Sequence, residues 1–522
     1  MKKIKDWPLL GILGIGLISR LLFLALRPTH FDEGIDGWWV DQMITNGFYS
    51  YDPLNYHGPF PFYFEFASKL LFGRNLWALR IPSVCFGMGS IYVLTRLKEF
   101  LGKPTAYGAA LLMAVSPAMV FYSRYTPHEI GLLFFSVVSC YGYLRYVEKK
   151  DRTSLFCLGL GIAGMATTKE TFIVNMVCFM LAVFTLKIYE SVFKIRPAIE
   201  ANPLKSKFTA KDLFDATLVS VLFFCIFYSG FFMHGEGILD FFKAFSSWAK
   251  TGTKGSGHDK PFWYWLENFK RYEIASFIGL VWCLKVLDPL WAPTTRQAHW
   301  VRLFSIWGLG TLLAYSIIPY KTPWCIIQLL WPFYIVLAAG VSEIAGYGKS
   351  AKIVVLGAFF ILVIAEGALA SRLTFFHSSD ETEPYVYVQT FPEIESVMEK
   401  LKALVKEDVN NYYLNIKVFK EDTWPIPWLL ADFPRVDWLS HSGFTNPDAP
   451  LIMADLSVRG QIEANLTRSY IYMIFRMRSS QDESIFYFDA DKFGKFFDKT
   501  APAFRPPPKS PVKMAPGVEV SK

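Results

Sequence analysis

Charge is scarce in this chain. Asp, Glu, Lys and Arg make up 19% of its 522 residues, hydrophobic residues make up 52%, and the mean hydropathy is +0.28. This balance excludes an ordinary soluble protein, and the charges cluster between apolar runs, which is typical of a protein that crosses a membrane several times. The net charge of +8 does not require a nucleic-acid partner, because most of the excess lies in short loops, where membrane topology accounts for it.

Cysteine is also scarce. The seven cysteines form no CxxC pair, and all lie within or at the edge of apolar runs. We interpret them as small buried hydrophobic residues, which argues against a disulfide framework or a cysteine metal site. The chain contains no internal repeat, Walker loop, HExxH or GxSxG motif. It offers no clean metal site either, so no cofactor is expected, although a divalent metal is not excluded.

The long apolar runs predict the fold. A helix needs about 20 apolar residues to cross a bilayer. Eleven candidate runs lie near residues 7–27, 76–96, 105–123, 128–147, 153–168, 170–188, 213–233, 271–289, 302–319, 322–343 and 351–371. They predict a polytopic α-helical membrane domain over 1–371. The basic start of the chain resembles a signal peptide, but no small-residue cleavage site follows, so we predict an uncleaved first span.

Lys and Arg predict the orientation. They recur in one alternating set of loops, which should face the cytoplasm together with the N-terminus. The 28–75 loop, the 234–270 loop and the C-terminal part are then extracytoplasmic. This arrangement predicts a multi-pass protein of the cell (plasma or inner) membrane. Within the second loop, the Gly- and Lys-rich stretch 251–260 is compatible with a lid over a site. A surface linker with an interfacial aromatic belt fits equally well.

The composition becomes polar after residue 371. Four short runs, 385–389, 415–419, 451–454 and 470–474, predict strands, and 393–406 predicts a helix. Alternating strands and helices indicate a small extracytoplasmic α/β domain over 372–500. The Pro- and Lys-rich end, 501–522, is expected to be disordered.

The residues whose side chains can bind a ligand or take part in a reaction lie at the outer ends of the predicted spans. Asp32 and Glu33 follow the first span, and a carboxylate pair there is unusual because a charge near the hydrocarbon is disfavoured by a few kcal/mol. The alternative is an ordinary solvated loop start. Several other charged or His residues lie on the same side: Arg124, His128, Glu129, Lys169, Glu170, His234, Glu236 and Lys321. They indicate a shared cavity at one membrane face.

This set of groups suits transfer from a lipid phosphate. A carboxylate can deprotonate or orient an attacking hydroxyl. Arg and Lys can hold a phosphate leaving group and take up its developing charge. Composition alone does not separate such an enzyme from a transporter, which also needs buried ionisable groups. An ion-coupled transporter is disfavoured because these groups lie at span ends.

The segment His30–Pro82 resembles the opening loop of membrane-embedded GT-C glycosyltransferases. Its motifs are Asp32-Glu33, Gly47-Phe48-Tyr49, Tyr51-Asp52-Pro53, His57-Gly58-Pro59, Leu71-Phe72-Gly73 and Arg80-Ile81-Pro82. Within GT-C enzymes it is similar to the protein O-mannosyltransferase and aminoarabinose transferase branch. The family to which it is most similar is the flippase-activity-associated family linked to archaeal N-glycosylation. Later motifs extend the likeness, among them Tyr122-Ser123-Arg124-Tyr125, Thr168-Lys169-Glu170-Thr171 and Trp424-Pro425-Ile426-Pro427-Trp428.

The resemblance implies a polyprenyl- or dolichyl-phosphate-sugar donor. Sugar transfer would be inverting, on the outer face, to a protein, lipid or glycan acceptor. It implies that Asp32 is the catalytic base with Glu33 beside it, and that Arg124 is a donor-phosphate ligand. His57 stands where the aminoarabinose branch has a lysine, and it is assigned to substrate binding. Three further residues are assigned to substrate binding: Lys169, His258 and Lys321. The alternative is a non-catalytic flippase or accessory protein for lipid-linked sugars.

Overall fold

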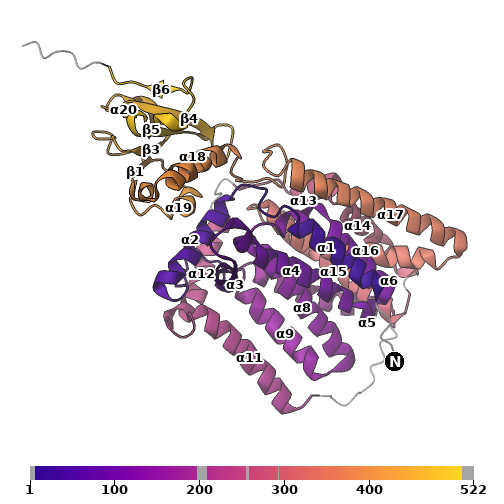
Figure 1. Cartoon of the computed structure of the whole chain (residues 1–522). Helices are drawn as coiled ribbons and strands as arrows, with labels where there is room; N and C mark the ends of the chain where they lie inside the picture. The colour runs from indigo at the N-terminus through magenta and orange to yellow at the C-terminus, as the bar shows by residue number, and fades with distance from the viewer. Residues whose placement is uncertain (1–5, 197–207, 254–257, 292, 508–522) are drawn as a thin grey trace, which may run out of the picture. The chain divides into compact units, whose positions relative to one another are not determined.

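The protein folds into two compact units in a computed structural model, which describes residues 6–196, 208–253, 258–291 and 293–507 (Figure 1). The first unit comprises Met1–Arg27 and Ile35–Tyr387, and the second comprises Pro28–Gly34 and Val388–Lys522. The sequence places the change of composition at residue 372. The chain that follows the last long helix stays with the helical unit through Tyr387.

The first unit is helical. Its elements are α1 (Trp7–Leu21), α2 (Phe31–Asn46, which begins in the second unit), α3 (Phe60–Phe72), α4 (Leu76–Arg96), α5 (Lys98–Leu101), α6 (Lys103–Val115), α7 (Pro117–Tyr122), α8 (His128–Lys149), α9 (Arg152–Ala166), α10 (Phe172–Val192), α11 (Ala210–Tyr228), α12 (Glu236–Thr253), α13 (Tyr264–Tyr272), α14 (Ile274–Val286), η1 (Pro289–Trp291), α15 (Arg296–Ile317), η2 (Pro323–Cys325), α16 (Ile326–Ala345), α17 (Lys349–Ser371) and η3 (Arg372–Phe376).

Each predicted span coincides with helix, so the predicted polytopic helical fold is confirmed. Among the residues that the structure describes, six helices are long and apolar enough to cross a membrane: Leu76–Leu101, His128–Lys149, Phe172–Val192, Arg296–Ile317, Pro323–Ala345 and Lys349–Phe376. The predicted span 105–123 is divided into α6 and α7, because Pro117 cannot continue the hydrogen bonding of α6. Ser116 caps the new helix by accepting a hydrogen bond from the Met119 N–H at 3.3 Å.

The two segments expected to be loops fold largely as helices, which corrects that expectation. The 28–75 segment contains α2 and α3, and the 234–270 segment contains α12 and α13. Val40 and Met43 of α2 share a buried apolar cluster with Ala244 of α12. Residues 254–257 of the glycine-rich stretch lie outside the described part of the chain, so the lid stays a prediction.

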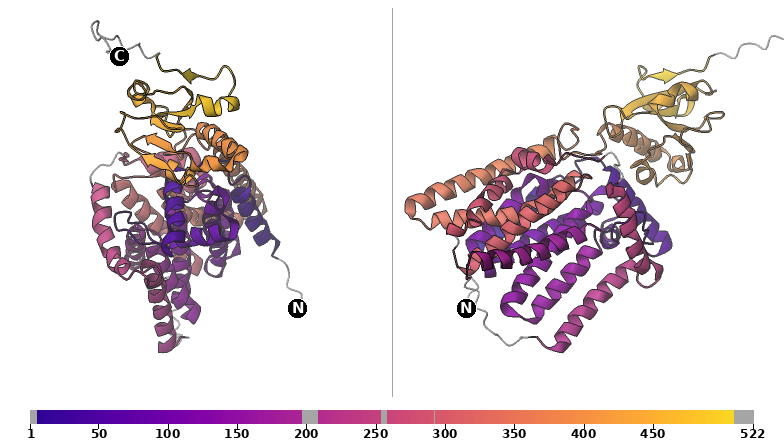
Figure 2. Two further views of the ribbon diagram at one scale, coloured as in Figure 1. Left: turned by 60° about the vertical axis from the view of Figure 1, so that its left-hand side comes forward. Right: turned by 180° about the vertical axis from the view of Figure 1, so that it is seen from behind.

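The helices pack in extended rows. α8 lies between α4 and α9, and α9 packs on α11. The row α8, α9, α11 is visible in Figure 1 and again from behind in Figure 2. α16 contacts α6, α14 and α15, and α10 packs on α15. This packing brings the start of α8 and the α9–α10 turn to the same end of the helices.

The second unit is a mixed sheet with helices on it. Its elements are α18 (Glu393–Glu407), η4 (Val409–Tyr413), β1 (Ile416–Phe419), α19 (Ile426–Leu429), β2 (Val436–Trp438), β3 (Leu451–Asp455), η5 (Leu456–Val458), α20 (Arg459–Glu463), β4 (Tyr470–Arg476), β5 (Glu483–Asp489), α21 (Ala490–Phe493), η6 (Gly494–Phe496) and β6 (Ala503–Phe504). The strand order is β2-β1-β3-β5-β4-β6. β1 is parallel to β2 and β3, whereas β5 is antiparallel to β3 and β4, and β6 is antiparallel to β4.

Both faces of this sheet are covered. Ile416 and Val418 pack in one apolar cluster with α18, while Ile452 and Ala454 belong to a second cluster. Strands buried on both sides read as nearly continuous apolar runs. The predicted helix and three of the predicted strands coincide with α18, β1, β3 and β4.

Two expectations about the C-terminal part are wrong. No strand forms over 385–389; the Val386 N–H instead donates to Glu383 O at 2.9 Å in a turn, and the Tyr385 hydroxyl donates to Glu273 at 3.2 Å. Residues 503–504, expected in the disordered tail, form β6, because β4 offers them a free edge to pair with. The rest of that tail, 508–522, lies outside the described residues.

Candidate functional site

Asp32 and Glu33 lie in the first turn of α2 and have different structural roles. Glu33 is fully buried, and its Oε2 accepts a hydrogen bond from the His30 N–H at 2.8 Å. A side chain that reaches back to the residue before the helix satisfies an orphan donor of the first turn. The Asp32 N–H donates to His30 Nδ1 at 3.1 Å, and the Asp32 side chain is 35% exposed. Asp32 is therefore the accessible carboxylate of the pair.

A buried ionic group lies in the helical unit. Lys169 Nζ is 3.1 Å from Glu129 Oε1, 4.0 Å from Glu170 Oε1 and 3.5 Å from His57 Nε2. The other nitrogen of His57, Nδ1, is 3.1 Å from Glu170 Oε2. These four residues are called the Lys169 cluster below. Two of the predicted binding residues, His57 and Lys169, are thus brought together from positions far apart in the chain.

His57 is placed beside Lys169 and Glu170 because the backbone before α3 lies close to the α9–α10 turn. Glu129 lies in the first turn of α8, Lys169 and Glu170 lie in the α9–α10 turn, and His57 precedes α3. The Gly58 N–H donates to Thr168 O at 3.2 Å. A Cβ on Gly58 would lie 2.2 Å from Thr167 O, so the backbone at this position requires glycine.

Two groups of the Lys169 cluster, Lys169 and Glu170, are held in their charged states. Burial disfavours the ammonium, yet Glu129 and Glu170 raise the pKa of Lys169 above its ordinary value. Burial likewise favours a neutral Glu170, but Lys169 and His57 lower the pKa of that carboxyl. Opposite charges a few ångströms apart produce these directions. Lys169 and Glu170 therefore form a buried pair of opposite charges at neutral pH.

A second acidic group lies next to the Lys169 cluster. The Thr126 hydroxyl donates to Asp36 Oδ2 at 2.7 Å, and His128 Nε2 is 3.8 Å from Asp36 Oδ1. The His128 ring is 5.0 Å from the His57 ring between centroids. Asp36 was not predicted as a site residue, although it lies four residues after Asp32 and so on the same side of a helix.

Arg124 lies at the carboxyl end of α1. Its guanidinium donates to the carbonyls of Ser19 at 3.1 Å, Arg20 at 2.8 Å and Phe23 at 2.7 Å. The carbonyls of Ser19 and Arg20 are among those that the end of α1 leaves without intrahelical partners, and Phe23 lies just beyond the helix. Burial, and then the neighbouring guanidinium groups, that of Arg27 first, lower the pKa of Arg124 to about 9. A role in holding donor phosphate stays a prediction.

His258 and Lys321 are neighbours through their backbones. Asp259 and Tyr320 form an isolated antiparallel bridge, and the Lys321 N–H donates to His258 O at 3.1 Å. Their side chains diverge, however. Lys321 Nζ donates to Lys260 O at 3.1 Å, whereas His258 Nδ1 is 2.5 Å from the Tyr387 hydroxyl.

The Lys321 turn also reaches the Lys169 cluster. Cys325 Sγ, at the end of η2, is 3.8 Å from Glu129 Oε1. This contact was missed in the sequence, where Cys325 is indistinguishable from the other buried cysteines. It makes the turn that carries Lys321 part of the wall around Glu129.

One triad in the described part of the chain has the spacing of metal ligands. His377, Asp380 and Glu383 bring candidate ligand atoms within 4.8 Å of one another. Glu383, however, is paired with Arg372 at 2.7 Å. Hydrogen bonds from the side chain and N–H of Thr382 lower the pKa of Asp380 to about 2. The three groups are accounted for as ion pairs and turn contacts, and we assign no metal to them.

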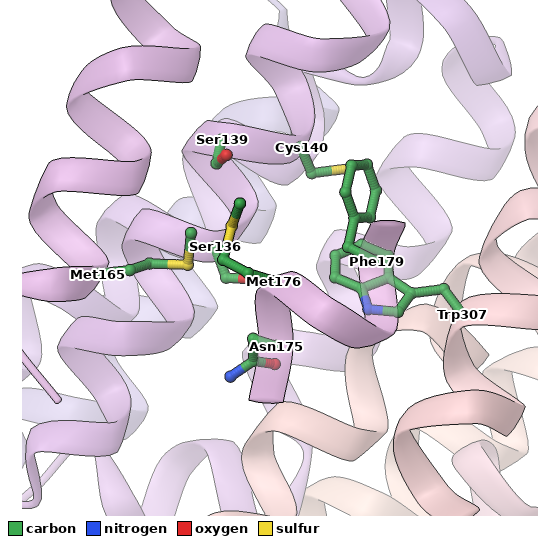
Figure 3. Close-up of a pocket in the computed structure, with 8 residues that line it drawn as sticks. All are labelled: Ser136, Ser139, Cys140, Met165, Asn175, Met176, Phe179 and Trp307. Carbon is green, nitrogen blue, oxygen red and sulfur yellow. The ribbon is translucent and has the colours of Figure 1, made fainter. Parts of the chain in front are cut away.

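A small cavity between α8, α9, α10 and α15 is shown in Figure 3. Its lining residues are Ser136, Ser139, Cys140, Met165, Asn175, Met176, Phe179 and Trp307. The volume of about 10 Å³ is close to the least that holds one water. It is too small for a sugar, so this cavity is not the substrate site.

Part of the sequence matches a family of membrane mannosyltransferases, and the fold resembles that of solved membrane transferases. Residues 56–197 match the model of the family described as dolichyl-phosphate-mannose-protein mannosyltransferase. The chain is also 31% identical over 116 residues to the "Putative mannosyltransferase YycA" of Bacillus subtilis (strain 168). That match spans 21% of this chain and 17% of the relative.

Solved structures share the fold over most of the chain. ArnT from Cupriavidus metallidurans bound to undecaprenyl phosphate matches with a TM-score of 0.57 and 11% identity, covering 93% of this chain and 98% of that one. The apo form of ArnT gives a TM-score of 0.60 with 10% identity, over 92% of this chain and 98% of that one. The Archaeoglobus fulgidus oligosaccharyltransferase tethered to an acceptor peptide gives 0.51 with 12% identity, over 90% of this chain and 73% of that one. The predicted GT-C resemblance is thereby confirmed at the level of the fold.

Proposed function

We propose that this protein is a membrane glycosyltransferase that moves a sugar from a polyprenyl- or dolichyl-phosphate donor to an acceptor. The observation that carries the proposal is the Lys169 cluster, a buried set of ionisable groups at helix ends, in a chain whose partly exposed Asp32 lies in the first turn of α2. A solved structure with the same fold has undecaprenyl phosphate bound. Buried charge at a membrane face is retained where it serves a ligand or a reaction.

The proposed reaction is a displacement with inversion. Asp32 accepts the proton of the acceptor nucleophile, whose electron pair forms a bond to the anomeric carbon of the sugar. The bond from that carbon to the phosphate oxygen breaks, and the lipid phosphate leaves with the bonding electrons. Lys169, His57 and Arg124 are the proposed groups that face the phosphate and stabilise its developing charge. His258 and Lys321 line the acceptor or sugar side in this proposal.

We further infer the cellular arrangement from charge. Basic residues in alternate loops support a cytoplasmic N-terminus and an extracytoplasmic site in the plasma or inner membrane. The acceptor is then a protein, lipid or glycan that reaches the outer face. A donor made on the cytoplasmic side would need to be moved across the bilayer first.

The test uses purified protein in lipid nanodiscs with a panel of polyprenyl-phosphate sugars and acceptors. Release of free lipid phosphate is measured for wild type, Asp32→Asn and the control Asp240→Asn, whose carboxylate, 13% exposed, pairs with the exposed Lys243 at 2.7 Å. We expect Asp32→Asn to bind donor and lose turnover, while the control retains it. Donor binding without release in the wild type, with every acceptor tried, would instead indicate a flippase or accessory protein.

A further inference from the structure

We propose that the C-terminal α/β domain positions the catalytic carboxylate, through a seat for residues 28–34 formed by Gln389, Pro425 and Arg478. This inference rests on the proposed function, because it assigns these residues a role in placing Asp32. The segment 28–34 folds with the second compact unit, although more than 350 residues separate it from the rest of that unit in sequence. Three contacts, before, beside and after Asp32, account for this.

The first contact holds the start of the segment. The Gln389 side chain, 2% exposed, donates from Nε2 to Pro28 O at 3.0 Å. Gln389 is itself fixed close to the sheet, because the Phe391 N–H donates to Met477 O at 2.8 Å just beyond β4. A buried amide with a carbonyl partner is a directional tether.

The second contact lies beside Asp32. The Arg478 guanidinium is 4.9 Å from the centre of the Phe31 ring. Two carboxylates hold it in place: Arg478 Nη2 is 2.7 Å from Asp422 Oδ2, and Arg478 Nε is 3.3 Å from Asp482 Oδ2. A guanidinium that is fixed by two anions presents its flat face to a ring at little entropic loss.

The third contact follows Asp32. Gly34 lies so close to Pro425 that an added Cβ would be 2.4 Å from Pro425 Cβ and 2.6 Å from Pro425 Cα. No side chain fits at this distance without moving the segment or the proline. The approach therefore fixes the position of Gly34 against Pro425 within the second unit.

The seat occupies a distinctive place in the sheet. Asp422 and Pro425 follow β1, and Arg478 and Asp482 lie in the β4–β5 turn. β4 runs in the same direction as β1 and β3, so these residues lie at the carboxyl ends of the strands. Ligands of open α/β sheets bind at that edge. Here the edge holds the chain's own Asp32 segment, and the three contacts leave the Asp32 carboxylate 35% exposed.

The test compares two arginines in matched settings. Arg478→Met removes the guanidinium over Phe31. The control Arg459→Met removes a guanidinium 4.6 Å from the Tyr472 ring, with its own i,i+4 partner Glu463 at 2.9 Å, in the same domain. Both variants are made in the full chain in nanodiscs. Hydrogen–deuterium exchange of residues 28–40 is measured together with kcat and KM for the donor.

We expect Arg478→Met to speed exchange in residues 28–40 and to lower kcat by about 10- to 100-fold, the scale of a catalytic group misplaced by about an ångström. Donor KM should change little, because the proposed role of Asp32 is in the transition state and not in binding the donor. Arg459→Met should change neither exchange nor kcat. Arg478→Lys keeps the charge but loses the two-carboxylate fork, and it should restore part of both readouts.

A glycine pair provides a second, independent comparison. Gly34→Ala should act like Arg478→Met, because its Cβ meets Pro425. Gly460→Ala, in α20 of the same domain, has nothing within 4 Å of the added Cβ and should behave as wild type.

The outcomes separate the two proposals. Equal exchange and equal kcat in Arg478→Met and Arg459→Met would overturn the seat. Faster exchange with unchanged kcat, or a lower kcat without faster exchange, would overturn the positioning role. Absence of turnover in the wild type would overturn the proposed function, and the exchange data would then still show whether the domain holds residues 28–34.

Discussion

Replacing Lys169 by methionine removes the cation that lies between Glu129 and Glu170, and we expect this change to be strongly destabilising. At an effective dielectric constant of about 20, unit charges at the observed 3.1 Å and 4.0 Å attract by about 5 and about 4 kcal/mol. Removing the ammonium from water offsets much of this attraction. The ion pairs themselves therefore add little net stability.

The variant, in contrast, leaves two carboxylates buried without their cation. Losing one partner of a buried pair lowers the free energy of unfolding by about 3–5 kcal/mol. Glu170 retains His57 at 3.1 Å, so Glu129 carries most of the effect. The double variant Lys169→Met/Glu129→Gln should regain part of the stability, because the buried charge of Glu129 is then absent.

The assay is the unfolding midpoint in detergent, followed by tryptophan fluorescence. The control is Lys243→Met, whose ammonium is only 2.7 Å from Asp240 Oδ1 but whose side chain is 68% exposed. If distance governed stability, the control would be the more damaging change. If burial governs it, as we argue, the control stays close to wild type. Equal midpoints for the two variants would refute this reasoning.

Two further predictions concern the same region. Gly58→Ala should lower the free energy of unfolding by about 1–3 kcal/mol, because the added Cβ meets Thr167 O. Gly235→Ala, whose added Cβ has nothing within 4 Å, should leave it unchanged. The thermal unfolding midpoints of the two variants test this difference. Glu170→Gln should be less stable than wild type at neutral pH, because Lys169 and His57 lower the carboxyl pKa in the folded state. That difference should be complete above about pH 4.3, the unfolded value, and should vanish as pH falls through the folded pKa; a constant difference in melting temperature across that range would contradict it.

Periodicity and length carried most of the fold prediction. Each predicted span is helical, because about 20 apolar residues in a row have few alternatives once their backbone must satisfy its own hydrogen bonds. The strands β1, β3 and β4 were also predictable, since Val418, Met453 and Phe475 are buried in one cluster and Phe419, Ile452 and Tyr470 in the other. β2 and β6, with three and two residues, were too short to carry a pattern.

The segments between the spans were the main failure. α2 and α12 contain polar and charged residues, so their hydropathy resembles that of loops. They are helical because Val40, Met43 and Ala244 meet in one buried cluster. Such tertiary burial overrides a weak local signal. The 385–389 run was wrongly predicted as a strand. Its aromatic residues have a high strand propensity, but the Tyr385 hydroxyl donates a hydrogen bond to Glu273 and the segment does not join a sheet.

The candidate site, like the fold, was only partly predictable from the sequence. The sequence by itself determined the residue types: a carboxylate pair after the first span, and His, Lys and Glu at the ends of later ones. Only the tertiary structure decided that His57, Glu129, Lys169 and Glu170 form one cluster, and that residues 28–34 fold with the distant α/β domain. The physical reason is that hydrophobic patterning acts locally along the chain. Ion pairs and close backbone approaches depend on which helix ends the packing brings together.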